Sequence, residues 1–312
     1  MEHRIDEGRV HHDWDNGLDP VLRVASGDVV AYDLRMAGHG QIAEGDSYED
    51  TALDFATLYH LAGPVWVEGA EPGDTLRVDI LDLEPGPWGW ASILPGLGLL
   101  PDDFPDPVVW TFDLRDRDRI AVAPGVSVPV APFLGTMGTH PDDPATGAAF
   151  PPHKGGGNVD TRHLRAGVTL YLPIWVEGAL FSCGDPHAAQ GDGEVCVTAV
   201  ECPMRARLRL SVEKRSIAAP TFVTPGALTP EADLHGYRGT MGLHADLMEG
   251  ARAAVRASID WLTRERGLTP EQAYLLCSLA GDLKIHEVVD SGVWNVGMTI
   301  PMAVFDDVRE SG

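Results

Sequence analysis

The sequence predicts a mainly β protein whose helices lie mainly in the C-terminal third. Three observations support this fold class. Glycine and proline are abundant, at 35 and 24 of 312 residues, and they interrupt the chain at short intervals, as a protein with many turns requires. Several segments before residue 246 alternate apolar and polar residues with a period of two. Apolar residues at helical spacing follow that point.

The alternating segments are predicted to be strands with one buried face. Leucine, valine and isoleucine alternate with polar or charged residues over 76–80 and again over 207–213. The runs 168–172 and 175–176 are more uniformly apolar, which favours strands that are buried more fully. After a glycine-rich stretch, the alternation at 195–199 predicts a further strand.

Two helices are predicted from their end signals. The first begins after Asp246, which forms a capping pair with Glu249, and ends at Gly267, because glycine tolerates the left-handed conformation at a helix end. The second begins at 269–272, Thr-Pro-Glu-Gln, where threonine can cap and proline suits the first helical position. It runs to about residue 281. Strands are predicted again over two later segments: 282–286 and 294–301.

We expect three regions that form one interwoven catalytic unit. Residues 1–134 form a β-rich N-terminal region, 135–245 a β region with the motifs described below, and 246–312 a helical and β C-terminal region. Two segments, 86–106 and 135–157, are too long for ordinary connections and are predicted to be functional loops.

The charge balance excludes several classes of partner. Aspartate and glutamate outnumber lysine and arginine by 47 to 23, which gives a formal net charge of −24. Such a field repels polyanions, so nucleic acid and anionic membrane surfaces are excluded as partners. No run approaches the ~20 consecutive apolar residues of a membrane span, and the N-terminus has no apolar signal region. With four cysteines that lack a C-x-x-C spacing, we expect a cytoplasmic protein with reduced thiols.

The densest group of polar residues lies between positions 155 and 201. Asp185 and His187 are two residues apart, and in an extended segment this spacing places both side chains on one face. A carboxylate and an imidazole so placed could bind one divalent ion, such as zinc. Asp160 and Glu194 could supply further oxygen ligands or the general base.

The same residues also have purely structural interpretations. Asp192 and Gly193 also fit the pattern of an ordinary two-residue hairpin turn. The pair Asp185 and His187 could be a surface hydrogen bond. Glu68 lies in an apolar stretch, where a carboxylate either faces outward or is placed for a function. Spacing alone leaves these alternatives open.

Other catalytic motifs are missing from the sequence. It has no G-x-S-x-G elbow, no Ser-Ser pair for a Ser-Ser-Lys amidase, and no phosphate-binding G-x-x-x-x-G-K-[ST] loop. Cys183 and Cys196 lie near His187 in sequence but within apolar strand patterns, where burial raises the pKa of a thiol. A cysteine nucleophile is therefore disfavoured.

The motifs of this chain resemble those of the acetamidase/formamidase family. Residues 184–195, GDPHAAQGDGEV, are similar to the family's G-D-x-H-A-x-Q-G-D-G-E-V signature, and 156–160, GGNVD, to its G-G-N-x-D motif. The segment 63–74, GPVWVEGAEPGD, looks like a further motif of the family. The resemblance spans nearly the whole chain. It departs from the family pattern at His39 and at 153–154, which leaves the preferred amide open.

The resemblance implies hydrolysis of formamide or acetamide to the carboxylic acid and ammonia. It implies a jelly-roll-like sandwich, a barrel-like β region and a small α/β C-terminal part that carries two helices. It also implies a homo-oligomer, a dimer or larger, and a metal-dependent site. Zinc is the first expectation for the metal and calcium the second. The implied metal ligands are Asp160, Asp185 and His187, and Asn158 would donate a hydrogen bond to the tetrahedral oxyanion.

The remaining motif residues are assigned to proton transfer and substrate contact. Glu194 is the first candidate for the general base, with Asp192 and Glu201 as alternatives. Gln190 and Glu68 are expected to contact the substrate. Two other functions remain open at this point: hydrolysis of another linear amide, and a non-catalytic β-rich protein that binds a small ligand without releasing ammonia.

Overall fold

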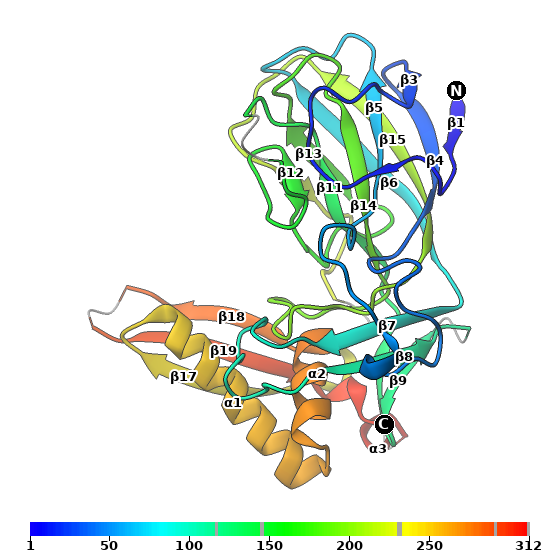
Figure 1. Cartoon of the computed structure of the whole chain (residues 1–312). Coiled ribbons are helices and arrows are strands. Elements are labelled where there is room, and N and C mark those ends of the chain that lie inside the picture. The colour runs from blue at the N-terminus through cyan, green and yellow to red at the C-terminus, as the bar shows by residue number, and fades with distance from the viewer. Residues whose placement is uncertain (116–117, 144–146, 230–232, 290–291, 311–312) are drawn as a thin grey trace.

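The structure is a computed structural model that describes residues 1–115, 118–143, 147–229, 233–289 and 292–310. Strands account for 39% and helices for 15%, which confirms the mainly β fold class. Figure 1 shows two lobes: a lobe of long strands, and a second lobe in which helices pack beside a smaller sheet. No closed barrel is formed by the described residues, so the barrel-like region implied by the resemblance is instead a set of separate small sheets.

The first lobe is built from two six-stranded sheets. In order, the strands of the first sheet are β1 (Glu2–Ile5), β4 (Asp28–Leu34), β15 (Met204–Glu213), β6 (Thr75–Pro85), β13 (Thr169–Pro173) and β16 (Thr221–Val223). Those of the second are β12 (Gly156–Asn158), β11 (Phe133–Gly138), β14 (Phe181–His187), β5 (Leu61–Val67) and β2 (Val10–His11), with β3 (Leu22–Val24) also paired to β5. Both sheets therefore contain strands from each of the first two predicted regions.

A shared apolar core holds the two sheets together. Along β15 the side chains alternate between buried and exposed, as the period of two predicts. Leu208 of β15 and Leu76 of β6 belong to the same buried cluster as Phe181 and Cys183 of β14. Burial on one face of the first sheet therefore fixes the register of β15, because a slip of one residue would turn its apolar side chains to solvent.

The second lobe contains the remaining strands and the helices. Its strands are β7 (Trp88–Ile93), β8 (Val108–Asp113), β9 (Arg119–Ala123), β10 (Val126–Pro129), β17 (Tyr237–His244), β18 (Asp282–Glu287) and β19 (Trp294–Pro301). Its helices are α1 (Leu247–Arg266), α2 (Pro270–Ala280) and the short α3 (Asp306–Glu310). The 3-10 turns among the described residues are η1 (Tyr48–Asp50), η3 (Asp233–His235) and η4 (Met302–Val304). Within the described ranges, no helix is both long and apolar enough to cross a membrane.

Both predicted helices begin and end where their signals indicated. The side chain of Asp246 accepts hydrogen bonds from the first turn of α1, and Gly267 ends that helix with a φ of 68°. Thr269 and Gln272 form a reciprocal capping box at the start of α2. The sequence did not predict α3.

Two strand predictions are wrong. Residues 175–176 lie outside β13, and 195–199 form turns rather than a strand. Val197 has a φ of 81°, which a regular strand does not allow. The predicted loops are partly structured, because 86–106 contains β7 and 135–157 includes the end of β11 and the start of β12.

The close approach of α1 to β17 gives a test of the fold. A Cβ atom on Gly242 would lie 1.9 Å from the carbonyl oxygen of Gly250, whereas one on Gly239 would meet nothing nearer than 3.6 Å. We expect Gly242→Ala to lower the free energy of unfolding by about 2–3 kcal/mol through overpacking. Gly239→Ala, on the same strand, should change it by less than about 0.5 kcal/mol. Thermal unfolding of both variants measures this, and equal melting temperatures would contradict the packing.

Candidate active site

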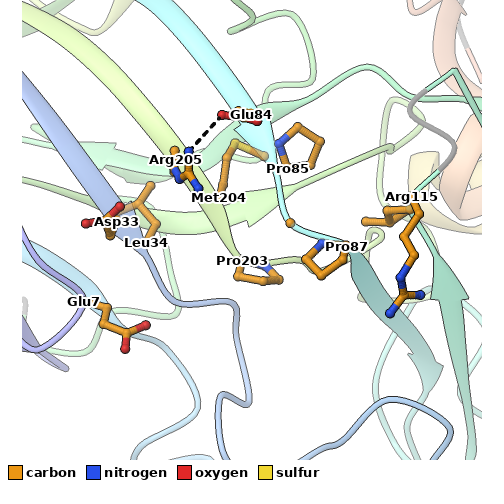
Figure 2. Close-up of a pocket in the computed structure, with 12 residues that line it drawn as sticks. Glu7, Asp33, Leu34, Glu84, Pro85, Pro87, Arg115, Pro203, Met204 and Arg205 are labelled. Carbon is orange, nitrogen blue, oxygen red and sulfur yellow. Dashed lines mark hydrogen bonds and ion pairs between the residues drawn. The ribbon is translucent and has the colours of Figure 1, made fainter.

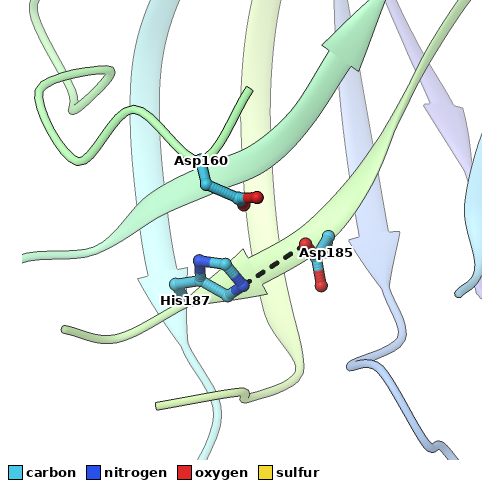
Figure 3. A group of neighbouring side chains, drawn as sticks. All are labelled: Asp160, Asp185 and His187. Carbon is cyan, nitrogen blue, oxygen red and sulfur yellow. Dashed lines mark ion pairs between the residues drawn. The ribbon is translucent and has the colours of Figure 1, made fainter. Parts of the chain in front are cut away.

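The side chains of Asp185 and His187 meet at the end of β14, as their two-residue spacing predicts. Asp185 Oδ2 lies 3.4 Å from His187 Nε2, and both side chains are buried. The antiparallel register of β11 on β14 places Gly135 directly across from Asp185. Figure 3 shows the carboxylate of Asp160, from the segment that follows β12, directed toward the same pair. Three residues from separate segments therefore converge.

Gly135 is the residue that lets Asp160 reach this pair. Its carbonyl oxygen accepts hydrogen bonds from the backbone N–H groups of Val159 (3.0 Å) and Asp160 (3.1 Å), which fix this segment against β11. A Cβ atom on Gly135 would lie 2.5 Å from Asp160 Oδ1, 2.8 Å from Asp185 Oδ2 and 2.8 Å from His187 Cε1. The three side chains thus surround the space that any larger residue would fill.

Two glutamates also lie close to His187. Glu201 forms β-bridges with both Trp90 and His187, and its Oε2 lies 3.1 Å from His187 Nε2. Glu194 lies in the turn that precedes this segment. One ligand atom each from His187, Glu194 and Glu201 lies within 4.8 Å of the others, and the same holds for Asp160, Asp185 and His187. His187 is therefore shared by two groups, either of which could hold a metal ion.

Several buried polar atoms of this cluster make no hydrogen bond to any described residue. They are Asp160 Oδ1, Asp185 Oδ1 and His187 Nδ1, whereas His187 Nε2 is in ion-pair contact with Asp185 and Glu201. Each such atom costs roughly 1–3 kcal/mol when it is buried without a partner. Carboxylate oxygens and imidazole nitrogens are the donors that divalent cations such as zinc prefer. The residues present therefore fit a metal ion.

Burial raises the pKa values of three acids near His187: Asp160, Glu194 and Glu201. Burial, reinforced by Asp185, raises the pKa of Asp160 to about 8. Burial raises the pKa of Glu201 to about 7, although His187 opposes the rise. Burial and Asp160 hold the pKa of Glu194 well above its usual range. Burial lowers the pKa of His187, but Glu201 and Asp185 outweigh it, so that the pKa is raised. Without a cation, the cluster therefore retains protons at neutral pH.

The backbone is strained at three of the acids. Asp160, Asp185 and Glu194 have φ angles of 42°, 52° and 41°, in the left-handed region that residues other than glycine rarely adopt. Strain of this kind costs about 1–3 kcal/mol per residue and persists where the surroundings enforce it, most often at functional sites. Its presence at three members of one cluster supports a functional role.

Two predicted residues brace Asp160. Asn158 Nδ2 donates to Asp160 Oδ2 at 2.9 Å, while Asn158 Oδ1 accepts from Thr136 Oγ1 at 2.5 Å. Gln190 Nε2 donates to the backbone carbonyl oxygen of Asp160 at 2.8 Å. The structure thus places both beside the cluster, and Gln190 lies behind Asp160 as a support.

A pocket of about 530 Å³ opens onto the cluster. Its polar lining residues are Asn158, Asp160, Glu194 and Tyr59. The ring of Tyr59 is half-buried, and burial together with Asp185 raises the pKa of its hydroxyl, which lies in the field of the acids. Sequence reasoning missed Tyr59, because it lies ahead of the motif at 63–74 and carries no signal of its own.

Asp192 and Glu68 lie outside the cluster. Asp192 Oδ1 is 3.5 Å from His163 Nε2, and its position supports the hairpin-turn interpretation. The side chain of Glu68 is 58% exposed and lies 3.9 Å from Arg23, because β5 ends one residue earlier and the chain turns to solvent. Glu68 does not line the pocket, which speaks against the substrate contact predicted for it.

The turn that carries Glu194 is attached to the second lobe. The backbone N–H of Gly191 donates to the carbonyl oxygen of Ser278 in α2 at 2.7 Å. The N–H of Asp192 donates to Asp282 Oδ1 at 3.2 Å, and the same oxygen accepts from Arg162 Nη1 at 2.5 Å. Arg162 and Asp282 are both nearly buried, so this ion pair is screened little by solvent. The end of α2 and the start of β18 therefore position Glu194.

A second hollow, of about 420 Å³, lies apart from this cluster and is shown in Figure 2. Glu84 and Arg205 line it and form an ion pair with each other at 3.5 Å. It contains none of the candidate metal-ligand groups found among the described residues. The pocket at Asp160 and Glu194 is therefore the candidate active site.

A family model described as the Acetamidase/Formamidase family matches residues 2–148 and 145–307. The chain therefore belongs to this family, which confirms the resemblance of its motifs. It is 29% identical to a formamidase of Methylophilus methylotrophus, over 97% of this chain and 91% of that protein. It is 30% identical to an acetamidase of Mycolicibacterium smegmatis, over 85% and 84%.

Solved structures agree with this assignment. A γ-lactamase from Delftia acidovorans matches with a TM-score of 0.90 at 25% identity, over 98% of this chain and 94% of that one. An acetamidase from Bacillus halodurans matches with a TM-score of 0.68 at 28% identity, over 98% and 99%. Together with the family, these neighbours identify the chain as an amide-hydrolysing enzyme.

Gly135→Ala tests whether the cluster depends on the absence of a side chain at position 135. The added methyl group would displace Asp160 and Asp185 from His187, so we expect bound metal and amide hydrolysis to fall by roughly 10–100-fold. Gly226→Ala is the matched control, since its Cβ would meet nothing within 4 Å. Metal analysis and kcat/KM of both variants measure the effect, and unchanged values for Gly135→Ala would refute this geometry.

The raised pKa values predict how the metal-free protein responds to pH. Asp160 and Glu201 have pKa values of about 8 and about 7 against ordinary values of 3.8 and 4.5, so the folded protein holds protons that the unfolded chain releases. Their contribution to stability is therefore present at acidic pH and lost as the pH rises toward 8. After treatment with a chelator, Asp160→Asn should therefore gain melting temperature relative to the unmodified chain as the pH rises from 5 to 8, because the variant lacks the group that must lose its proton. The same pH dependence in both proteins would contradict the raised pKa of Asp160.

Proposed function

We propose that this enzyme hydrolyses primary carboxamides, including formamide and acetamide, to the carboxylic acid and ammonia, and that it depends on a divalent cation. The observation that carries the cation's role is the convergence of Asp160, Asp185 and His187 with buried atoms that lack partners. Zinc suits one imidazole with carboxylates, and calcium is the second candidate because most of the donors are carboxylate oxygens.

A cation held by these three residues would supply positive charge that polarises the amide carbonyl and lowers the pKa of water toward ~7. The residues of the chain supply the rest. Asn158 uses one of its amide N–H groups to hold Asp160 and keeps the other free to donate to the developing oxyanion. Glu201 is buried, and its Oε2 lies 3.1 Å from His187 Nε2, so that it helps to orient the imidazole.

Glu194 is our candidate for proton transfer. It lines the pocket, whereas Glu201 is nearly fully buried, so Glu194 is the better placed to meet a substrate. Because its pKa is raised, the ionised Glu194 is a stronger base than an ordinary glutamate, and it can take a proton from water and then pass it on. In the reaction, the water oxygen bonds to the carbonyl carbon, the C–N bond breaks, and the proton held by Glu194 passes to the departing nitrogen. Ammonia leaves as a neutral molecule, because proton delivery avoids an amide anion.

Cyclic amides are a second candidate class of substrate. The higher of the two reported TM-scores belongs to the γ-lactamase, although its sequence identity is the lower. Ring opening would use the same groups, but it yields an amino acid and releases no ammonia. The homo-oligomer implied by the resemblance stays a prediction.

The test is amide turnover by purified protein before and after removal of metal. We expect ammonia from acetamide, loss of that activity with a chelator, and recovery on addition of zinc or calcium. Glu194→Gln should lower kcat by about 10²–10⁴-fold, the usual range for a general acid or base. Glu177→Gln is the control, because Glu177 is exposed and does not line the pocket.

Full activity in protein shown to be free of metal would eliminate the cation from the proposal. Normal turnover by Glu194→Gln would assign proton transfer elsewhere, with Glu201 next in line. A γ-lactam assayed in parallel for its amino-acid product decides between linear and cyclic amides.

A further inference from the structure

We infer that the preferred substrates are carboxamides whose acyl group is an apolar chain or ring of about five to eight carbons, rather than formamide or acetamide. The inference rests on the proposed function, and it concerns the part of the pocket that the reacting amide does not occupy. Three features carry it: the volume of the pocket, the chemistry of its walls and the way the walls are held.

The pocket is much larger than a short amide. Its volume of about 530 Å³ equals the share of roughly 18 water molecules at ~30 Å³ each. Formamide and acetamide have three and four non-hydrogen atoms and would leave most of this space to water. Pockets of ~300–1,000 Å³ are typical of sites that enclose ligands of drug size. The volume alone therefore favours a substrate with a substantial acyl group.

The walls of the pocket away from the acids are apolar. They come from four segments that lie far apart in sequence and are represented by Leu99, Phe150, Met248 and Leu283. The polar side chains of the lining all belong to the catalytic end, where Tyr59 joins the acids. No lysine or arginine lines the pocket in the described part of the chain. A charged or strongly polar acyl group would thus lose its hydration without gaining a partner, whereas an apolar group is favoured by burial.

The apolar wall is fixed before any substrate binds. The backbone N–H of Leu99 donates to the carbonyl oxygen of Val195 at 2.8 Å and to the hydroxyl of Tyr274 at 3.0 Å. Arg252 of α1 donates to the carbonyl oxygen of Leu99 at 3.0 Å. Phe150 packs edge-to-face on Tyr59 with ring centroids 5.6 Å apart. Because these contacts are already made, the wall does not need to close on a substrate, and little ordering cost opposes binding.

The rim of the pocket is also apolar. The side chains of Phe150 and Met248 are 45% and 52% exposed, although both are large and hydrophobic. Both side chains line the pocket, so they extend its apolar wall to the solvent. They would cover the far end of an acyl chain that reaches out from the acids.

The experiment is the dependence of kcat/KM on acyl-chain length in metal-loaded enzyme. Each methylene group that becomes buried should raise kcat/KM by about fourfold. We expect hexanamide to exceed acetamide by at least about tenfold, and benzamide to follow hexanamide. Adipic acid monoamide, similar in length but ending in a carboxylate, should fall well below hexanamide.

Variants on the wall distinguish the pocket from a general preference for apolar substrates. Met248→Ala, at the exposed rim, and Ala251→Leu, which fills the wall, should both lower the hexanamide-to-acetamide ratio of kcat/KM. Met241→Ala is the matched control, because Met241 is 63% exposed and does not line the pocket. If Ala251→Leu does not fold, Met248→Ala carries the test alone.

A kcat/KM that is flat or falls with chain length, while acetamide is still turned over, would overturn this inference and leave the proposed function intact. Unchanged ratios in both wall variants would overturn it as well. Failure to hydrolyse any amide in metal-loaded protein would instead refute the proposed function itself.

Discussion

The rest of the structure depends on one constraint, the burial of several carboxylates around a single imidazole. Asp160, Asp185 and Glu201 all approach His187 where little solvent remains to screen their charges. Such a group is unfavourable unless its atoms are held and satisfied. The backbone holds them: β14 carries two of the residues, the Gly135 carbonyl fixes a third, and a bridge to Trp90 fixes the fourth. The strain and the unpaired atoms that remain point to a ligand that compensates for both.

The two lobes contribute different parts of this arrangement. The second sheet of the first lobe supplies the rigid centre, because β12, β11 and β14 are neighbours in hydrogen-bonded register. The second lobe supplies apolar walls and the support for Glu194, through Ser278 and Asp282. The pocket is formed where these contributions meet. Its acidic residues and its apolar wall therefore come from different parts of the fold.

Local signals in the sequence predicted what is locally determined. Period-two alternation predicted β15, and capping residues predicted both long helices. The two-residue spacing predicted that Asp185 lies beside His187. The strand predicted over 195–199 was wrong, because the apolar residues of this segment are buried against α2 and not within a sheet. Tyr274 and Ser278 of α2 form hydrogen bonds with its backbone. Local patterns also carried no information on strand order. The convergence of Asp160 on His187, and the roles of Gly135 and Tyr59, therefore emerged only from the fold.

The attachment of the 191–194 turn to α2 and β18 has a consequence for how such an enzyme can be altered. Glu194 owes its place to groups that follow it by about ninety residues, since Asp192 bonds to Asp282. Under the proposed function, the sandwich by itself would hold the three cation ligands without a positioned proton carrier. Recombination or trimming between the lobes would therefore separate Asp160, Asp185 and His187 from the support of Glu194.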